Sequence, residues 1–388
     1  MAIPTLAIAL TAVSAVLSQS APRPEIPTVL SALSYSEEGK LVLDVNGQPL
    51  PDLAKKDPYT LAQMLGNPTG AETGIALDFS DPALNGTVAY GPYNETADYP
   101  TVAFLPKTVK LHGGKAVLEF KSVFKGSNDF FKLSEKGRGI VGYRVIDGEG
   151  RIIYEGRVAF NGKGPYEVVP TLVEGPFVNN LDSSGCMLSY ETQVPVLTTV
   201  TVYGKTFRDA TASTHHEIGL AGLRAATHYA YAISYGDRID RHRFETAPEE
   251  GSRKPFTFAF ASANRATTGG GERDFGGTNY SSTRAVMAAA MLHDAVFMQA
   301  SGDITTGENA IEGAHLLEYA NWKRALEPFW SKIPVYVGFG DHEDQFVTFS
   351  PSPVTKKSPK LDRFPYATDS GEAVFAKAFV HPANGPDS

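Results

Sequence analysis

The sequence has little cysteine and no excess of positive charge, and each shortage excludes a class of protein. Cys186 is the only cysteine among 388 residues, whereas a disulfide framework or a cysteine-based zinc site needs at least two. Lys and Arg total 35 against 43 acidic residues, which gives a net charge of -8. A surface of this sign repels polyanions, so we expect no nucleic-acid partner.

Long apolar runs are also scarce, and the one at the start of the chain is typical of an export signal. Ile3 to Leu17 is apolar and is followed by small and polar residues at 18–21, which predicts a signal peptide at residues 1–21. We therefore expect a secreted, periplasmic or cell-surface protein. No Lys or Arg precedes the run, so an uncleaved anchor and a misassigned start stay open. No other stretch reaches spanning length, so we expect no stable membrane span.

Turn-forming residues are plentiful and favour short strands over long helices. The chain contains 37 Gly and 26 Pro, and its length fits two to four domains. A strand at 41–45 enters an Asn-Gly turn, and apolar arms at 140–146 and 151–160 flank a Gly-rich turn, as in β-hairpins. We expect residues 28–165 to form a β-sandwich-like domain.

The next segment, 170–248, predicts a second all-β domain of seven short strands. Its stretch from Leu223 to Tyr229 resembles the tyrosine corner of fibronectin type III domains, in which a Tyr hydroxyl bonds back to the backbone. We expect Tyr229 to take that part. Domains of this kind serve as spacers or binding platforms, so the N-terminal β domains are candidates for binding a surface ligand.

From residue 254 the pattern changes to alternating strands and helices. Apolar strands are expected at 256–261, 296–300 and 333–339, and helices at 281–292 and 312–330. This order predicts a parallel sheet with helices packed on its faces. The expected fold class is therefore multidomain: two all-β sandwich-like domains followed by a partial α/β domain at 254–388.

Polar residues follow each of the three strands. They are Ser262-Ala263-Asn264-Arg265, then Ser301-Gly302-Asp303, then Gly340-Asp341-His342-Glu343. Open α/β sheets place their sites beyond the carboxyl ends of the strands. In this order the motifs resemble those of the calcineurin-like metallophosphoesterases, and the fibronectin-type domain before them resembles the arrangement of purple acid phosphatases. The resemblance covers roughly residue 170 to the end.

The resemblance implies a role for each residue. Asp303 matches the carboxylate that bridges two metals, and Asp341 takes the place of a metal-binding Asn. His342 matches the residue that contacts phosphate and protonates the leaving oxygen. Arg265 and Asn264 are expected to contact the substrate. The family uses two divalent or trivalent metal ions of the Fe, Zn or Mn class, and these activate a hydroxide that attacks the phosphoester.

Two departures from the family pattern weaken the expected site. Ala263 stands where the family has its first metal-binding Asp, and the later Gly-His motifs are missing, since His381 is the only His after His342. The α/β part therefore looks like the N-terminal half of the family domain. We expect weak or single-site metal binding.

The resulting function hypothesis is an exported metal-dependent phosphoesterase whose activity these departures put in doubt. The alternative is a noncatalytic cell-surface or adhesion module with a remnant phosphoesterase domain. Blander roles also stay open: Asp303 as a turn residue, His342 as a loop residue and Arg265 as a surface residue. Glu343 fits a supporting role better than a ligand role.

Overall fold

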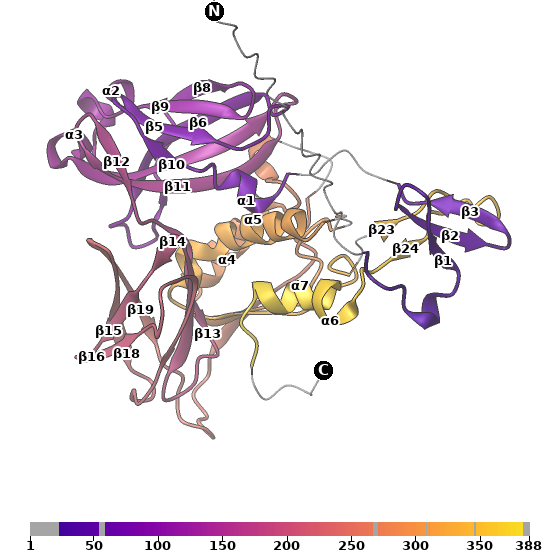
Figure 1. The fold of residues 1–388 in the computed structure, drawn as a ribbon. Coiled ribbons are helices and arrows are strands. Elements are labelled where there is room, and N and C mark those ends of the chain that lie inside the picture. Colours follow the sequence, from indigo (N-terminus) through magenta and orange to yellow (C-terminus); the bar gives the residue numbers. More distant parts are fainter. Residues whose placement is uncertain are drawn as a thin grey trace, which may run out of the picture.

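The computed structural model describes residues 23–53, 59–266, 271–307, 309, 311–344 and 347–382. The predicted signal peptide at residues 1–21 lies outside these residues. Within the described part, no helix is long and apolar enough to cross a membrane. Several antiparallel sheets precede a C-terminal parallel sheet with helices (Figure 1), as the sequence predicts.

The first large β unit is a two-sheet sandwich. Its larger sheet has the order β12-β11-β10-β6-β7 with β8 also paired to β6, and the smaller is β4-β5-β9. The elements are α1 (Leu61–Met64), β4 (Thr69–Gly70), β5 (Gly74–Asp78), β6 (Gly86–Asn94), β7 (Thr101–Val102), β8 (Lys107–Leu111), β9 (Lys115–Glu119), α2 (Phe120–Val123), η2 (Gly126–Asn128), α3 (Leu133–Lys136), β10 (Arg138–Asp147), β11 (Ile152–Gly162) and β12 (Tyr166–Val169). The β10–β11 hairpin confirms the strongest hairpin signal of this region.

The segment before this sandwich packs elsewhere. After η1 (Thr28–Leu30), the strands β1 (Leu33–Tyr35), β2 (Leu41–Val45) and β3 (Gln48–Pro51) form a separate sheet. The φ angles of Asn46 and Gly47 are +56° and +77°, which confirms the tight hairpin turn. Asp52 bridges to Phe349, so this sheet lies beside β23 (Val347–Thr348) and β24 (Lys360–Leu361). Residues 33–51 therefore pack with the C-terminal part, although they fall within the predicted 28–165 domain.

The second β unit is a seven-stranded sandwich. Its sheets have the orders β13-β14-β17 and β16-β15-β18-β19. The strands are β13 (Leu172–Asn179), β14 (Cys186–Val196), β15 (Thr198–Val202), β16 (Lys205–Arg208), β17 (Ser213–Leu220), β18 (His228–Tyr235) and β19 (Arg238–Glu245). The Tyr229 hydroxyl accepts a 2.8 Å hydrogen bond from the Arg224 backbone N–H. This contact confirms the predicted tyrosine corner.

The C-terminal part contains the predicted βαβ unit. β20 (Thr257–Ala261), β21 (Ala295–Ala300) and β22 (Val335–Val337) are parallel and pair in that order. The other elements are η3 (Gly271–Arg273), α4 (Tyr280–Leu292), α5 (Glu312–Trp330), α6 (Tyr366–Asp369) and α7 (Gly371–Ala378). Asn279 caps α4 by accepting a hydrogen bond from the Ser282 N–H, which fixes where the helix begins.

The sequence predicts a parallel sheet with helices packed on its faces, and the structure shows such a sheet with helices. Within the described residues, one face of the sheet is packed and the other is open. Met298 and Ala300 are fully buried in the core that includes Met287 and Trp322. On the other face, Phe258 and Phe260 are 53% and 62% exposed. The Phe258 ring stacks on Phe297 of the next strand at 5.2 Å. Within the described chain, the β20 side chains thus alternate between a packed face and an open aromatic face.

Helix α5 joins the three large units, and 14 of its 19 residues are buried. Its Glu327 carboxylate lies 2.6 Å from the Arg157 guanidinium of β11 and also pairs with Arg324. Arg157 donates to the Leu172 and Gly175 carbonyls, and Arg324 donates to the Val173 carbonyl. The two guanidinium groups therefore tie α5 and β11 to the backbone of β13.

We expect Glu327→Gln to destabilise the fold strongly, because it leaves Arg157 and Arg324 buried without their counter-charge. The expected loss in free energy of unfolding is about 3–5 kcal/mol, measured by urea denaturation. Arg243→Gln is the matched control, since it removes an exposed ion pair with Asp98 and should cost less than about 1 kcal/mol. Equal losses in the two variants would show that the buried cluster does not hold the units together.

Candidate metal and phosphate site

Two glycines bring the ends of β21 and β22 together. A Cβ atom added to Gly302 would lie 2.5 Å from the Gly340 backbone nitrogen, and one added to Gly340 would lie 2.5 Å from the Asp303 nitrogen. Both distances are far below van der Waals contact, so only glycine permits this approach. As a result, Asp303 at the end of β21 lies beside the turn that carries Asp341 and His342.

Glu343 links these two loops through hydrogen bonds to its carboxylate. Its side chain is fully buried, and its Oε2 accepts hydrogen bonds from the N–H groups of Asp303 at 2.9 Å and Gly340 at 2.8 Å. Its Oε1 accepts from the N–H groups of Ile304 at 3.0 Å and Thr305 at 3.4 Å. Burial raises the pKa of Glu343, while these backbone N–H groups oppose the rise. Glu343 therefore has the supporting role that the sequence favoured.

Asp303, Asp341 and His342 form a group whose chemistry fits a metal ion. Each offers one ligand atom, and the three atoms lie within 4.8 Å of one another. The His342 Nδ1 lies 2.7 Å from the Thr306 carbonyl oxygen, which can only accept, so Nδ1 is the donor there and Nε2 is the nitrogen available as a ligand. Two carboxylates and an imidazole suit a divalent ion of the Zn or Mn type. His342 thus joins the two residues predicted as ligands.

The end of β20 supplies a cation in place of a further carboxylate. The Arg265 Nη1 lies 3.4 Å from Asp303 Oδ2, and the Arg265 side chain is 41% exposed. Ala263 is exposed and has φ +52°, a left-handed conformation that Asp, Asn and Gly adopt more readily than Ala. The backbone at Ala263 is therefore shaped for a residue other than the one it carries.

Asn264, predicted to bind substrate, is turned into the protein. It is only 8% exposed, and its Oδ1 has no hydrogen-bond partner among the described residues. Its backbone carbonyl accepts a 2.7 Å hydrogen bond from the Asn279 N–H. A buried oxygen without a partner fits a bound water or cation better than a direct contact with a large substrate.

The groups that support the site residues were not predicted from the sequence. Besides the Thr306 carbonyl that orients His342, the Gly307 N–H donates a 2.9 Å hydrogen bond to the Glu318 carboxylate of α5. No motif marks these residues, because a backbone carbonyl and a helix carboxylate eleven positions away leave no local pattern. The loop after β21 is thereby attached to α5.

No family model matches this chain, and no curated protein is similar to it in sequence. Among solved structures, the fold of this chain is similar to the structure of PhoD. The sequence identity is 15%, the match covers 51% of this chain and 42% of PhoD, and the TM-score is 0.34. It is also similar to the purple acid phosphatase PPD1 isolated from yellow lupin (Lupinus luteus) seeds, with 11% identity, coverage of 80% and 59%, and a TM-score of 0.40.

The likeness is distant and structural. A third similar structure is the central fibronectin-III array of RIM-binding protein, with 12% identity, coverage of 50% of this chain and 74% of that chain, and a TM-score of 0.25. The chain spans less than two thirds of the length of PhoD or PPD1, at 42% and 59%. The roles of the site residues rest on their geometry.

We expect Glu343→Gln to loosen both loops, because an amide places its NH₂ group against two backbone N–H donors whichever way it is turned. The loss in free energy of unfolding should be about 2 kcal/mol, and Mn²⁺ affinity should fall with it, as measured by thermal denaturation and calorimetric titration. Glu372→Gln, an exposed carboxylate on α7, is the control. If the variant is destabilised but its Mn²⁺ affinity is unchanged, Glu343 supports the fold and does not position the metal group.

Proposed function

We propose that this chain is a metal-dependent phosphoesterase that acts at the ends of β20, β21 and β22. The observation that carries the proposal is the group of Asp303, Asp341 and His342, whose ligand atoms lie within 4.8 Å of one another. Arg265 beside this group adds a cation that suits a phosphate oxygen. Export of the protein is part of the same proposal. It rests on the apolar run at residues 3–17 of the sequence.

The residues present fit one metal ion better than two. Three donors meet the usual minimum for a catalytic cation, and Ala263 adds none. Arg265 lies 3.4 Å from Asp303, where its positive charge repels a second cation. We therefore propose a single ion of the Mn, Zn or Fe class, held by Asp303, Asp341 and the His342 Nε2.

Such an ion would supply Lewis-acid polarisation of a phosphoryl oxygen when bound. The chain's own contribution is to bind and orient the ester. Arg265 would place its guanidinium against the phosphate and offset the charge that develops there. The hydrogen bond from His342 Nδ1 to the Thr306 carbonyl fixes the orientation of the imidazole ring. The substrate class is a phosphoric ester.

A noncatalytic role is the second candidate, and one observation favours it. The Arg265–Asp303 ion pair already neutralises the carboxylate that would be central to the site, and Ala263 supplies no replacement. In that case the β units would bind a surface ligand and the α/β part would be a remnant. Metal titration and hydrolysis measured on the same preparation distinguish the two candidates.

We expect the full chain to bind Mn²⁺ and to hydrolyse 4-nitrophenyl phosphate, and Asp303→Asn to reduce both. Asn tolerates the φ of +54° at this position, so the change removes charge and leaves the backbone as it is. Metal affinity should fall by about tenfold or more, measured by calorimetry. Asp294→Asn, an exposed residue with φ +53°, is the control. A folded wild-type chain without metal binding or hydrolysis supports the noncatalytic candidate.

Ala263→Asp should increase Mn²⁺ affinity and the rate of hydrolysis, because it adds an oxygen ligand beside Asp303 at a residue whose φ suits Asp. Ala263→Asn shares the backbone preference but carries no charge, so comparing the two isolates the effect of the carboxylate. The gain for Asp over Asn should be about threefold or more in metal affinity. Equal affinities would mean that a carboxylate at position 263 does not reach the metal ion.

A further inference from the structure

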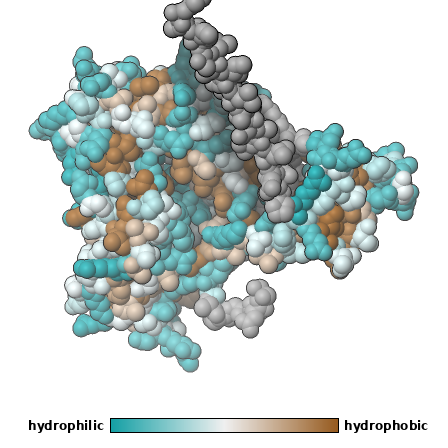
Figure 2. Space-filling model, in the orientation of Figure 1, coloured by the Kyte–Doolittle hydropathy of each residue, from teal (hydrophilic) through white to brown (hydrophobic). Residues whose placement is uncertain are grey.

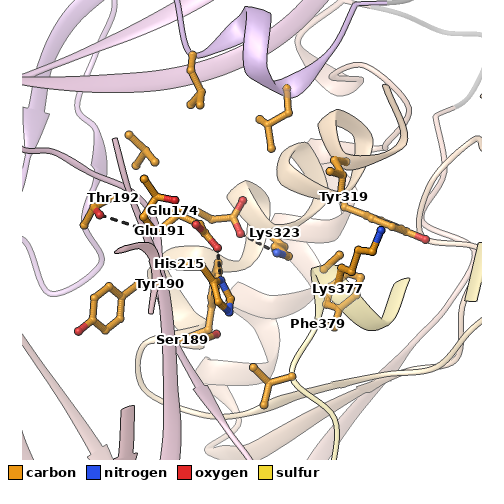
Figure 3. A pocket seen from close by; sticks show the side chains of 18 of the residues that line it. Glu174, Ser189, Tyr190, Glu191, Thr192, His215, Tyr319, Lys323, Lys377 and Phe379 are labelled. Atoms are coloured by element: carbon orange, nitrogen blue, oxygen red, sulfur yellow. Dashed lines mark hydrogen bonds and ion pairs between the residues drawn. The ribbon is translucent and has the colours of Figure 1, made fainter. Parts of the chain in front are cut away.

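A cavity of about 380 Å³ lies apart from the strand-end site. It is lined by residues of β13, β14 and β17 of the second sandwich, of α5 and α7, and of β11 and α1 of the first sandwich, and Figure 3 labels several of them. None of the proposed metal ligands lines it. Its volume lies in the range that holds a small organic ligand, and junctions between structural units are common places for such sites.

Much of the cavity wall is apolar. Leu61, Leu316, Phe177 and Phe379 contribute to it, and Figure 2 shows apolar surface between the two β units on this side of the molecule. Leu61 and Leu316 are only half-buried. An apolar ligand body that covered them would gain free energy by removing their surface from water.

The floor of the cavity carries an ion pair that is already complete. Lys323 Nζ lies 2.7 Å from Glu174 Oε1, and both side chains are almost buried. The same ammonium lies 5.7 Å from the Phe177 ring centroid and 5.1 Å from that of Phe379. A ligand gains little free energy by competing with these contacts. We therefore expect the floor to contribute only packing contacts, and the charged residues of the rim to contribute the electrostatic attraction.

The rim holds more negative than positive charge. His215 lies between two carboxylates, with Nδ1 2.5 Å from Glu191 Oε1 and Nε2 3.2 Å from Glu217 Oε1. The hydrogen bond with Glu191 contributes most to raising the pKa of His215 to about 9, so one imidazolium serves two carboxylates at neutral pH. The other rim pair, Lys377 with Glu312 at 3.1 Å, is balanced.

Gln193 adds a neutral amide group to the cavity lining. The Gln193 Oε1 has no hydrogen-bond partner among the described residues, and Gln193 lines the same cavity. This oxygen has almost no accessible surface, so as the Gln193 side chain stands it offers no contact to a ligand in the cavity. The cavity therefore offers net negative charge at the rim and apolar wall elsewhere.

We propose that this cavity binds an organic cation, a primary amine with an aromatic or aliphatic body. The ammonium group would lie at the rim near Glu191 and Glu217, and the body would lie against Phe177, Leu316 and Leu61. An anion of the same shape is repelled by the rim, and a neutral alcohol lacks the charge attraction. This proposal is independent of the phosphoesterase proposal.

The test uses the full chain and three ligands of matched shape: 2-phenylethylamine, 2-phenylethanol and phenylacetate. At pH 8 and low salt, titration calorimetry should show saturable binding of the amine, at least about fivefold tighter than the alcohol. Phenylacetate should bind more weakly than the alcohol. The advantage of the amine over the alcohol should shrink in high salt. An amine that binds no better than the alcohol, or does not bind, overturns the proposal.

Variants place the binding at the rim. Glu191→Gln with Glu217→Gln removes two negative charges and the partners that keep His215 protonated, so the preference for the amine should be lost. Glu250→Gln, an exposed carboxylate outside the cavity, should leave it unchanged. If the double variant folds, as its circular dichroism would show, and still prefers the amine, the rim is not the binding site and the proposal fails.

Discussion

The Glu327 carboxylate lies between the guanidinium groups of Arg157 and Arg324, and the rest of the architecture depends on this buried cluster. Burying three charges costs free energy that is offset when the charges pair and make further hydrogen bonds. The carbonyls of β13 supply such bonds by accepting from both arginines. The cluster therefore forms only when β11, β13 and α5 meet in one arrangement, and it fixes where α5 lies.

The position of α5 in turn determines the strand-end site. Its Glu318 accepts from the Gly307 N–H, which anchors the loop that contains Asp303 and the Thr306 carbonyl. Asp303 has φ +54°, as unfavourable for most residues as the φ of +52° at Ala263. Such conformations persist when surrounding contacts determine them, and here the contacts come from Glu343 and the close approach of Gly302 to Gly340.

The sequence predicted what local patterns determine. The hairpin at β10 and β11, the tyrosine corner and the three parallel strands follow from alternation, turn residues and runs of apolar side chains. Gly302 and Gly340 directly precede Asp303 and Asp341, so the meeting of these two strand ends was also predictable. The pairing of Lys323 with Glu174 was not, because 149 residues separate them and nothing in either segment specifies the other.

The open face of the parallel sheet could not be predicted from the sequence, for a different reason. The run at 256–261 reads as a fully buried strand, since Phe256, Phe258 and Phe260 are as apolar as any core residue. An apolar side chain indicates that burial is favourable. It does not indicate whether another element of the folded chain packs over that side chain. For the same reason, the sequence could not show that residues 33–51 leave the first sandwich to pack beside β23.

The cavity and the strand-end site share α5 but use different sides of it. Glu312, Leu316, Tyr319 and Lys323 line the cavity, and their spacing of three or four residues places them on one face of the helix. Glu318, which supports the site loop, lies off that face. Coupling between the two would require α5 to shift, and any shift would strain the buried cluster at Glu327. The Glu327 cluster therefore opposes coupling between the two sites through a movement of α5.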